Sequence, residues 1–231
     1  MRKAARFLGW LALALAALFL AVQLSYLARI WWWRDHAPQS TAFMESRFGE
    51  LHRKNPKAQL QYKWVPYDRI ATPLKRAVVA AEDAKFVDHD GFDWEAIEKA
   101  REKNEKKGRV VAGGSTISQQ LAKNLFLSGE RSMWRKGQEA LITVMIEHLL
   151  DKRRILEIYL NVIEWGEGVF GAEAAARHYY GVNAAALGAE ASARLAAMVP
   201  RPRYYDTHRN DRWLARKTQI ILERMPSAEL P

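Results

Sequence analysis

The 231-residue chain contains no cysteine. This absence excludes disulfide scaffolds, cysteine-ligated zinc, iron–sulfur clusters and thiol nucleophiles. Internal repeats are also missing, and no segment shows the sustained apolar–polar alternation of a half-buried strand. Acidic residues are outnumbered, with 26 Asp and Glu against 36 Lys and Arg, which leaves a net charge of +10. Apolar residues make up 49% of the chain, enough to exclude intrinsic disorder.

The longest apolar run lies near the N-terminus, from Phe7 to Leu27, and carries no charge. At 1.5 Å per residue, a helix of about this length crosses the roughly 30 Å hydrocarbon layer of a bilayer. Residues 1–34 are therefore predicted to form a cytoplasmic tip and a transmembrane anchor. A cleaved signal peptide is the alternative, although its apolar core is usually only about 7–15 residues long. Basic residues precede the run and aromatic residues follow it, which predicts a cytoplasmic N-terminus and an exported body: Arg2, Lys3, Arg6, Trp31, Trp32 and Trp33.

The body is predicted to be mainly α-helical. Residues 35–64 are polar and interrupted by prolines, which indicates a connector with a short helix near residues 43–51. From residue 65 to 231 the apolar residues recur at a helical period, which predicts one domain with a real core. Helix starts are expected at Thr72, Asp93, Gly114 or Ser115, Ser132, Asp151, Gly171, Ala189 and Asn210, most of them capping or turn residues.

A first candidate site lies where an apolar helix is expected to end, at Glu82 and Asp83. Partial burial raises the proton affinity of such a carboxylate, as a general base working near neutral pH requires. On a helix the two neighbours point about 100° apart, so only one of them can face a given substrate atom. An acidic pair at a helix end is more often a solvated terminus. His89 lacks a second spaced histidine and is more often a packing residue than a metal ligand.

A second candidate site begins at Gly113 and Gly114, followed by hydroxyl and amide side chains. Glycines at a helix start expose backbone N–H groups that favour phosphate or another anion. Further along, Arg135 and Glu139 are spaced as an i,i+4 pair, which by itself is typical of a surface salt bridge.

Two other segments have simple interpretations. The lysine- and glutamate-rich stretch from Glu98 to Lys107 is typical of a solvated helix face, and a mobile flap beside a site is the alternative. Residues 166–171 match the G-x-G-x-x-G pattern of dinucleotide-binding folds. Because the preceding segment is predicted to be helical and no βαβ unit follows, nucleotide binding is not expected there.

Five segments, taken in order, resemble the motifs of the peptidoglycan glycosyltransferases, glycosyltransferase family 51. They read EDAKFVDHDGFD, GGSTISQQLAKNLFL, RKGQE, RRILEIYLN and GVFGAEAAARHYYG. The resemblance extends from about Val65 to Met225 and is specific, because long motifs recur in one order. Lys85 stands where many relatives have arginine, and Tyr180 replaces a common phenylalanine. The resemblance implies a lysozyme-like α-helical domain, and no penicillin target is expected because Ser-x-x-Lys and Lys-Thr-Gly are both missing.

The resemblance implies the polymerisation of lipid II. The 4-hydroxyl of an acceptor sugar attacks the anomeric carbon of a lipid-linked donor, polyprenyl diphosphate leaves, and a β-1,4 bond forms with inversion. Glu82 takes the position of the family's catalytic glutamate, the general base. Lys123 and Arg131 match positions that contact the diphosphate, whose developing charge must be stabilised. Glu139 matches a second essential glutamate, for which we expect a supporting role that orients Arg135, Lys136 or a divalent cation.

The predicted site residues fall into three groups. The catalytic residues are Glu82 and Glu139. The substrate-binding residues are Ser115, Thr116, Gln119, Gln120, Lys123, Asn124, Arg131, Arg135 and Lys136. The residues expected to hold the shape of the site are Asp83, Phe86, His89 and Gly91.

The resemblance also predicts partners and location. No organic cofactor is expected, and Mg²⁺ or Mn²⁺ at the diphosphate is the candidate metal. The expected partners are lipid II, the growing lipid-linked glycan strand, the membrane, and other cell-wall synthesis and division proteins. Nucleic acid is not expected. The predicted location is the bacterial cytoplasmic (inner) membrane, with a single pass and the catalytic domain on the periplasmic or outer face.

Two other functions stay open at this stage. A lysozyme-like lytic glycosidase would cut the bond that the transferase makes. Hydrolysis normally uses two carboxylates, whereas departure of a diphosphate requires cations, so Lys123 and Arg131 favour transfer. A basic membrane-tethered binding protein would need a compact Lys/Arg face with aromatic stacking positions, but here basic and acidic residues are interleaved.

Overall fold

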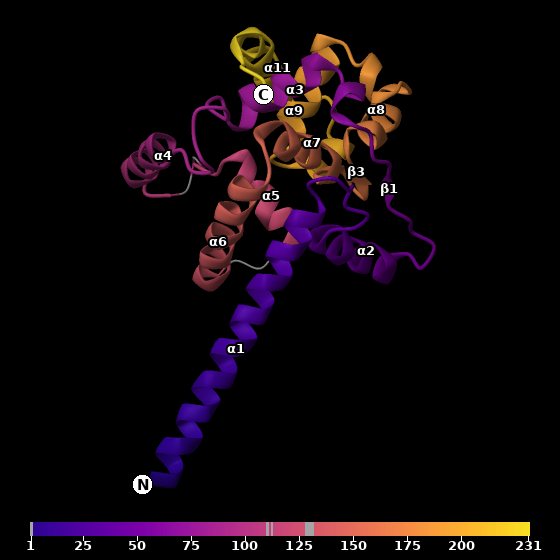
Figure 1. The fold of residues 1–231 in the computed structure, drawn as a ribbon. Coiled ribbons are helices and arrows are strands. Elements are labelled where there is room, and N and C mark those ends of the chain that lie inside the picture. The colour runs from indigo at the N-terminus through magenta and orange to yellow at the C-terminus, as the bar shows by residue number, and fades with distance from the viewer. Residues whose placement is uncertain (1, 110, 112, 128–131) are drawn as a thin grey trace.

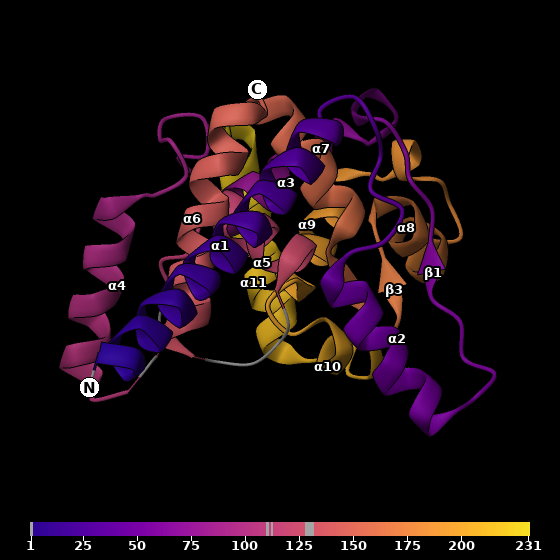
Figure 2. The same cartoon turned by 60° about the horizontal axis from the view of Figure 1, so that its bottom comes forward.

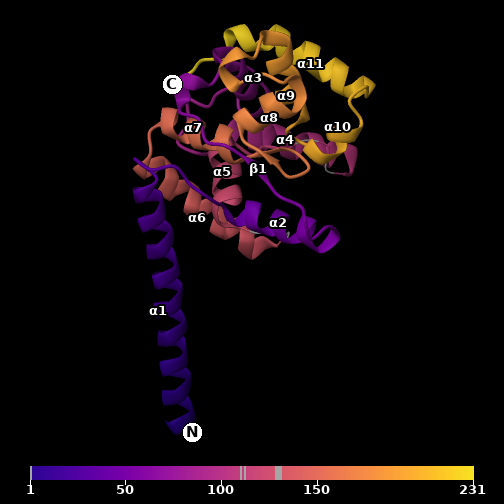
Figure 3. The same cartoon turned by 90° about the vertical axis from the view of Figure 1, so that its right-hand side faces the viewer.

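The computed structural model describes residues 2–109, 111, 113–127 and 132–231. A long helix, α1 (Arg2–Trp32), projects from a helical body (Figure 1). Figure 3 shows the same projection from the side. Among the described residues, the segment Ala5–Trp32 is the one helix long and apolar enough to cross a membrane, with a mean hydropathy of 2.3. Its side chains are almost all exposed, as expected of an anchor whose surroundings are lipid.

The segment after the anchor packs on the body. Helix α2 (Ala42–Lys54) begins at Thr41, whose hydroxyl accepts a hydrogen bond from the Met44 N–H. This helix lies against α5 (Ile117–Phe126), and the short strand β1 (Gln61–Tyr62) follows it. Residues 35–64 therefore form part of the wall of the domain.

The remaining helices build the body, and the mainly α fold is confirmed. Within the described residues they are α3 (Thr72–Glu82), α4 (Trp94–Lys107), α6 (Met133–Leu149), α7 (Lys152–Val162), α8 (Ala172–Tyr180), α9 (Ala189–Met198), α10 (Pro202–Thr207) and α11 (Arg212–Arg224). Short 3₁₀ turns occur at Tyr67–Arg69, Ala184–Ala186 and Met225–Ser227.

Local chemistry sets most helix starts. Asp93, Ser132 and Asp151 cap α4, α6 and α7 as predicted, each accepting a backbone N–H. Helix α5 instead begins after Thr116, because a capping box links Thr116 to Gln119.

Two other starts also differ by one residue. Helix α11 begins after Asp211 rather than Asn210, because the Asp211 carboxylate accepts from two backbone N–H groups. Helix α3 begins after Ala71 rather than Thr72, because the Ala71 carbonyl already accepts from Leu74 and Lys75.

The core is continuous through the body. Helix α3 packs against α9 and α11, while α5 packs against α6 and α7 (Figure 2). Large side chains with no exposure fill the space between them: Phe86, Tyr159, Trp165 and Phe170. Helices α3, α5 and α6, which carry most of the predicted site residues, are thereby fixed relative to one another.

A small sheet supports one side of the body. Strand β3 (Val169–Phe170) pairs with β1 in parallel and with β2 (Glu164–Gly166) antiparallel. The G-x-G-x-x-G segment contains the end of β2, the turn and β3, so it joins two antiparallel strands. Gly171, at a φ of +84°, lies so close to α7 that a Cβ would be 2.5 Å from the Asn161 carbonyl oxygen.

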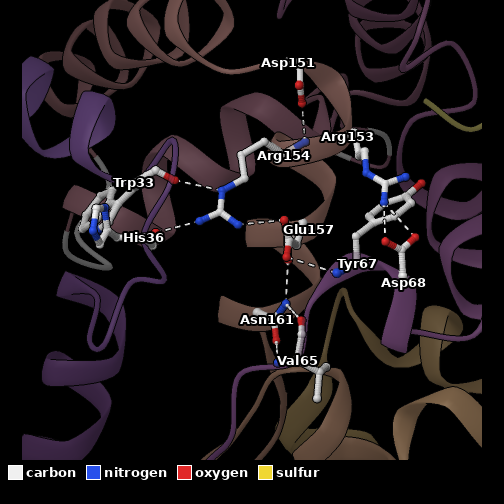
Figure 4. A network of polar contacts seen from close by, with 10 residues as sticks. All are labelled: Trp33, His36, Val65, Tyr67, Asp68, Asp151, Arg153, Arg154, Glu157 and Asn161. Carbon is white, nitrogen blue, oxygen red and sulfur yellow. Dashed lines mark hydrogen bonds and ion pairs between the residues drawn. The ribbon is translucent and has the colours of Figure 1, made fainter.

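Helix α7 joins the anchor and the connector to the body (Figure 4). The Arg154 guanidinium donates to the backbone oxygens of Trp33 and His36 at 2.8 and 2.6 Å, and pairs with Glu157 at 2.7 Å. Asn161 exchanges two hydrogen bonds of 2.9 Å with the backbone of Val65. The residues that follow α1 are therefore held directly on a core helix.

Candidate functional site

A cleft with a volume of about 670 Å³ opens between α5, α6, α2 and the segment before α10. Its lining is mostly polar and basic. The lining residues are Phe43, Arg47, Gln120, Lys123, Asn124, Arg135, Ile163, Glu164, Val199, Pro200, Arg201, Pro202, Arg203 and Tyr204.

Glu82 is the last residue of α3 and reaches the cleft through a lining residue. Its Oε2 accepts a hydrogen bond of 2.8 Å from Nε2 of Gln120, a lining residue. Burial raises the pKa of Glu82, while the hydrogen bond from Gln120 and the charges of Lys217 and Lys123 lower it. A carboxylate whose pKa is shifted upward in this way has the property expected of a general base near neutral pH.

The side-chain oxygen of Gln120 also accepts a hydrogen bond. The hydroxyl of Tyr159, on α7, donates to Gln120 Oε1 at 2.8 Å. Tyr159 is fully buried, and burial raises its pKa well above the ordinary value. A continuous chain of hydrogen bonds therefore runs from the core through Gln120 to Glu82.

Both oxygens of the Asp83 carboxylate bond to groups within the fold. One of its oxygens lies 2.9 Å from His89 Nε2, and the other accepts the Ile117 N–H at 2.9 Å. Asp83 lies just outside α3, with a φ of −163°, so a change of backbone direction separates the two carboxylates and not the 100° helical step we expected.

Phe86, His89 and Gly91 also make contacts inside the domain. Phe86 is fully buried. Gly91, at a φ of +89°, accepts a hydrogen bond of 2.7 Å from the Thr116 hydroxyl through its carbonyl. A Cβ at Gly91 would lie 2.8 Å from the side chain of Thr143, so this close approach to α6 requires glycine.

Two basic side chains pair with one buried carboxylate beside the cleft, and a third, Lys123, feels its charge. Glu139 on α6 accepts from Arg135 at 3.1 Å and from the Lys136 ammonium. Burial lowers the pKa of Lys123 on α5, and the charge of Glu139 opposes this effect. The charges of Arg135 and Lys136 lower it further, while the charge of Glu82 raises it. The predicted base Glu82 and Lys123, the predicted diphosphate-binding residue within the described ranges, therefore act on each other electrostatically.

The other predicted substrate-binding residues are divided between two hollows. Asn124 lines the cleft with Gln120, Lys123 and Arg135. A second hollow, of about 410 Å³, lies under α4 and is lined by Ser115, Gln119 and Lys136 among others.

Thr116 and Arg131 complete the predicted substrate-binding residues, and Gly114 precedes them. Thr116 is buried, and its side chain is used in the cap of α5 and in the bond to Gly91. Arg131 lies outside the described residues. Gly114 passes so close to α4 that a Cβ would lie 2.8 Å from the Ile97 backbone, which explains this glycine without an anion.

Sequence reasoning missed several residues that the fold brings to the site. Lys217 on α11 is half-buried and acts on Glu82. Glu164 and Arg47 form an ion pair of 3.2 Å in the cleft wall. Tyr159 lies on the apolar face of its helix, and a helical pattern marks such a residue only as core.

A metal held by protein groups alone does not fit this arrangement. Both Glu139 oxygens already accept hydrogen bonds from cationic side chains. Within the described ranges, no three His, Asp or Glu side chains come together to hold a metal ion. The divalent cation expected at the diphosphate stays a prediction, and no step below uses it.

Comparison with known proteins agrees with the motifs. A model of the Transglycosylase family matches residues 49–226, beginning within α2. The chain is 60% identical over 226 residues to a biosynthetic peptidoglycan transglycosylase of Janthinobacterium sp. (strain Marseille), covering 98% of each protein. It is 64% identical over 218 residues to that of Laribacter hongkongensis (strain HLHK9), covering 94% of this chain and 96% of the relative. With that of Thiobacillus denitrificans it shares 58% identity over the full length of both. The chain therefore belongs to the transglycosylase family.

Proposed function

We propose that this protein is a peptidoglycan glycosyltransferase that polymerises lipid II into β-1,4-linked glycan strands. The observation that carries the proposal is that Glu82 is hydrogen-bonded to Gln120, which lines the same cleft as Lys123 and Arg135, and that Glu82 and Lys123 act on each other electrostatically. The relatives named above are biosynthetic peptidoglycan transglycosylases, and their name agrees with this activity.

The base takes one proton in this reaction. The acceptor 4-hydroxyl transfers its proton to the Glu82 carboxylate while its oxygen bonds to the anomeric carbon of the donor. The raised pKa of Glu82 supports this role, because a more basic carboxylate accepts the proton more readily. The bond from the anomeric carbon to the diphosphate oxygen breaks with its electron pair, and the configuration at that carbon inverts.

The leaving polyprenyl diphosphate gains negative charge as that bond breaks. Lys123 and Arg135 line the cleft and are placed to stabilise this charge before it develops. Glu139 keeps the cations together, because it pairs with Arg135 and Lys136 and opposes the lowering of the Lys123 pKa. Arg131 joins this group in the proposal on the motif alone.

The anchor places the reaction at a membrane surface. We propose a single-pass protein of the bacterial cytoplasmic (inner) membrane, with the N-terminus in the cytoplasm and the catalytic domain on the periplasmic or outer face. The helix Ala5–Trp32 supports attachment, and the exposed Trp31 and Trp32 suit the far interface. A substrate whose polyprenyl tail stays in the bilayer requires such a location. Other cell-wall synthesis and division proteins are candidate partners.

Purified full-length protein with lipid II in detergent tests the function. The proposal predicts glycan polymer, separated by gel electrophoresis, and release of polyprenyl diphosphate. A lytic glycosidase would instead release sugar fragments from finished cell wall and make no polymer. A nucleic-acid tether would yield neither product and would retain DNA in a salt-dependent filter-binding assay.

A further inference from the structure

We propose that Tyr159 is a positioning residue for the general base, holding the Gln120 amide so that its NH₂ group faces Glu82 and favours the ionised carboxylate. The inference rests on the proposed function and adds to it a residue that touches neither sugar.

The geometry fixes the direction of each hydrogen bond. The Tyr159 hydroxyl donates to Gln120 Oε1 at 2.8 Å, and Gln120 Nε2 donates to Glu82 Oε2 at 2.8 Å. An amide side chain has an acceptor on one side and a donor on the other. A donor at the oxygen therefore decides that the nitrogen points to the carboxylate.

The opposite amide orientation shows what the tyrosine prevents. With the amide turned over, Gln120 Oε1 would face Glu82 Oε2, and two acceptors would meet. That pair is stable only when Glu82 carries a proton, which disables it as a base. Tyr159 is buried without exposure and keeps its hydroxyl proton because burial raises its pKa well above the ordinary value. Among the described residues, Gln120 Oε1 is the acceptor for this hydroxyl proton. The hydroxyl could also accept from a turned-over amide, but its own buried proton would then have no acceptor.

Other charges facing Glu82 come from several helices. Lys123 on α5 and Lys217 on α11 favour the ionised form, while the adjacent Asp83 disfavours it. Replacing Tyr159 by phenylalanine leaves all three unchanged. This substitution therefore isolates the orientation of the amide from the charges around it.

The test compares kcat/KM for lipid II polymerisation across pH in wild type and Tyr159→Phe. Without the tyrosine donor the amide can turn over, so the acid limb of the profile should move to higher pH. Loss of a hydrogen bond to a charged group predicts about a tenfold lower kcat/KM on the acid side, with recovery to within about twofold on the alkaline side. An unchanged limb, or an equal loss at every pH, would overturn the inference.

Tyr62→Phe is the matched control. The Tyr62 hydroxyl donates to the Pro38 carbonyl at 2.6 Å, and Tyr62 is not among the lining residues of the cleft. Its substitution also removes one partly buried tyrosine hydrogen bond, but the acid limb should not move. A displacement equal to that of Tyr159→Phe would overturn the specific role of Tyr159.

Gln120→Leu keeps the inference testable if Tyr159→Phe does not fold. Leucine removes the NH₂ donor itself, so the acid limb must again move to higher pH. An unchanged limb would overturn the inference that the Gln120 amide stabilises ionised Glu82. If both variants fold, Tyr159→Phe must add no further displacement in the Gln120→Leu background, because the tyrosine acts only through the amide. Failure of the proposed function is seen separately, as an absence of polymer from the wild-type protein.

Discussion

Glu139 gives a sharp test of how the cations of the cleft are held together. Its side chain is 5% exposed and pairs with Arg135 and Lys136, whose side chains are 19% and 46% exposed. Its charge also opposes the lowering of the Lys123 pKa. Glu139→Gln keeps the shape of the side chain and removes only the charge.

The size of the effect follows from these exposures. The bond to Arg135 is well buried, and losing a hydrogen bond between charged groups costs about 2 kcal/mol of unfolding free energy. Lys136 is half exposed, so solvent screens its pairing and little is lost there. Without the Glu139 charge the pKa of Lys123 falls further, so Lys123 loses its proton at a lower pH. The alkaline limb of the activity profile should therefore move to lower pH.

Urea denaturation and the pH profile of lipid II turnover measure the two effects. Glu173→Gln is the matched control, because Glu173 is equally buried and pairs with Arg177 at 2.8 Å. It does not act on Lys123, so it should lower stability and leave the alkaline limb in place. An alkaline limb that stays unchanged in Glu139→Gln would refute the supporting role of this glutamate.

Three shorter predictions concern the leaving group, the backbone and the anchor. Lys123→Ala should lower turnover about a hundredfold or more, and by more than Arg135→Ala. Equal losses in steady-state rate would contradict this order of roles. Gly171→Ala should lower the unfolding free energy by about 3 kcal/mol or more, because its Cβ would clash with a carbonyl of α7 at a positive φ. Gly181→Ala, at a φ of +67° with open space around it, should cost only about 1–2 kcal/mol in the same urea titration, and similar costs would contradict the clash. Gln23→Leu removes a buried amide bond of 3.0 Å between α1 and α6, so the distance between spin labels on these helices should broaden in pulsed EPR. An unchanged distribution would argue against this contact.

The parts of the fold predictable from the sequence are those that local chemistry determines. The anchor follows from an uncharged run of sufficient length, and the caps at Asp93, Ser132 and Asp151 follow from single side chains that bond to the next turn. The family motifs predict which residues belong to one site, and that grouping stays a prediction; the charge of Lys123 does lower the pKa of Glu82.

Contacts between distant segments could not be predicted in the same way. Strand β1 consists of Gln61 and Tyr62 and exists only because Val169 and Phe170 lie beside it, and two residues carry no periodic signal. Tyr159 has the pattern of a core residue, and its hydroxyl has a role only because α5 brings Gln120 within 2.8 Å. Ser115 and Gln120 are both predicted to bind substrate, but Ser115 lines the hollow under α4 whereas Gln120 lines the cleft.

The most direct test of the central claim is lipid II turnover by wild type and Glu82→Gln measured side by side. Glutamine has nearly the same shape and can still accept the bond from Gln120, but it cannot take the acceptor's proton. The account predicts that polymer formation falls by about 10²–10⁴-fold, while the unfolding midpoint and lipid II binding stay close to wild type. Polymer formation by Glu82→Gln at a rate near that of wild type would contradict the account.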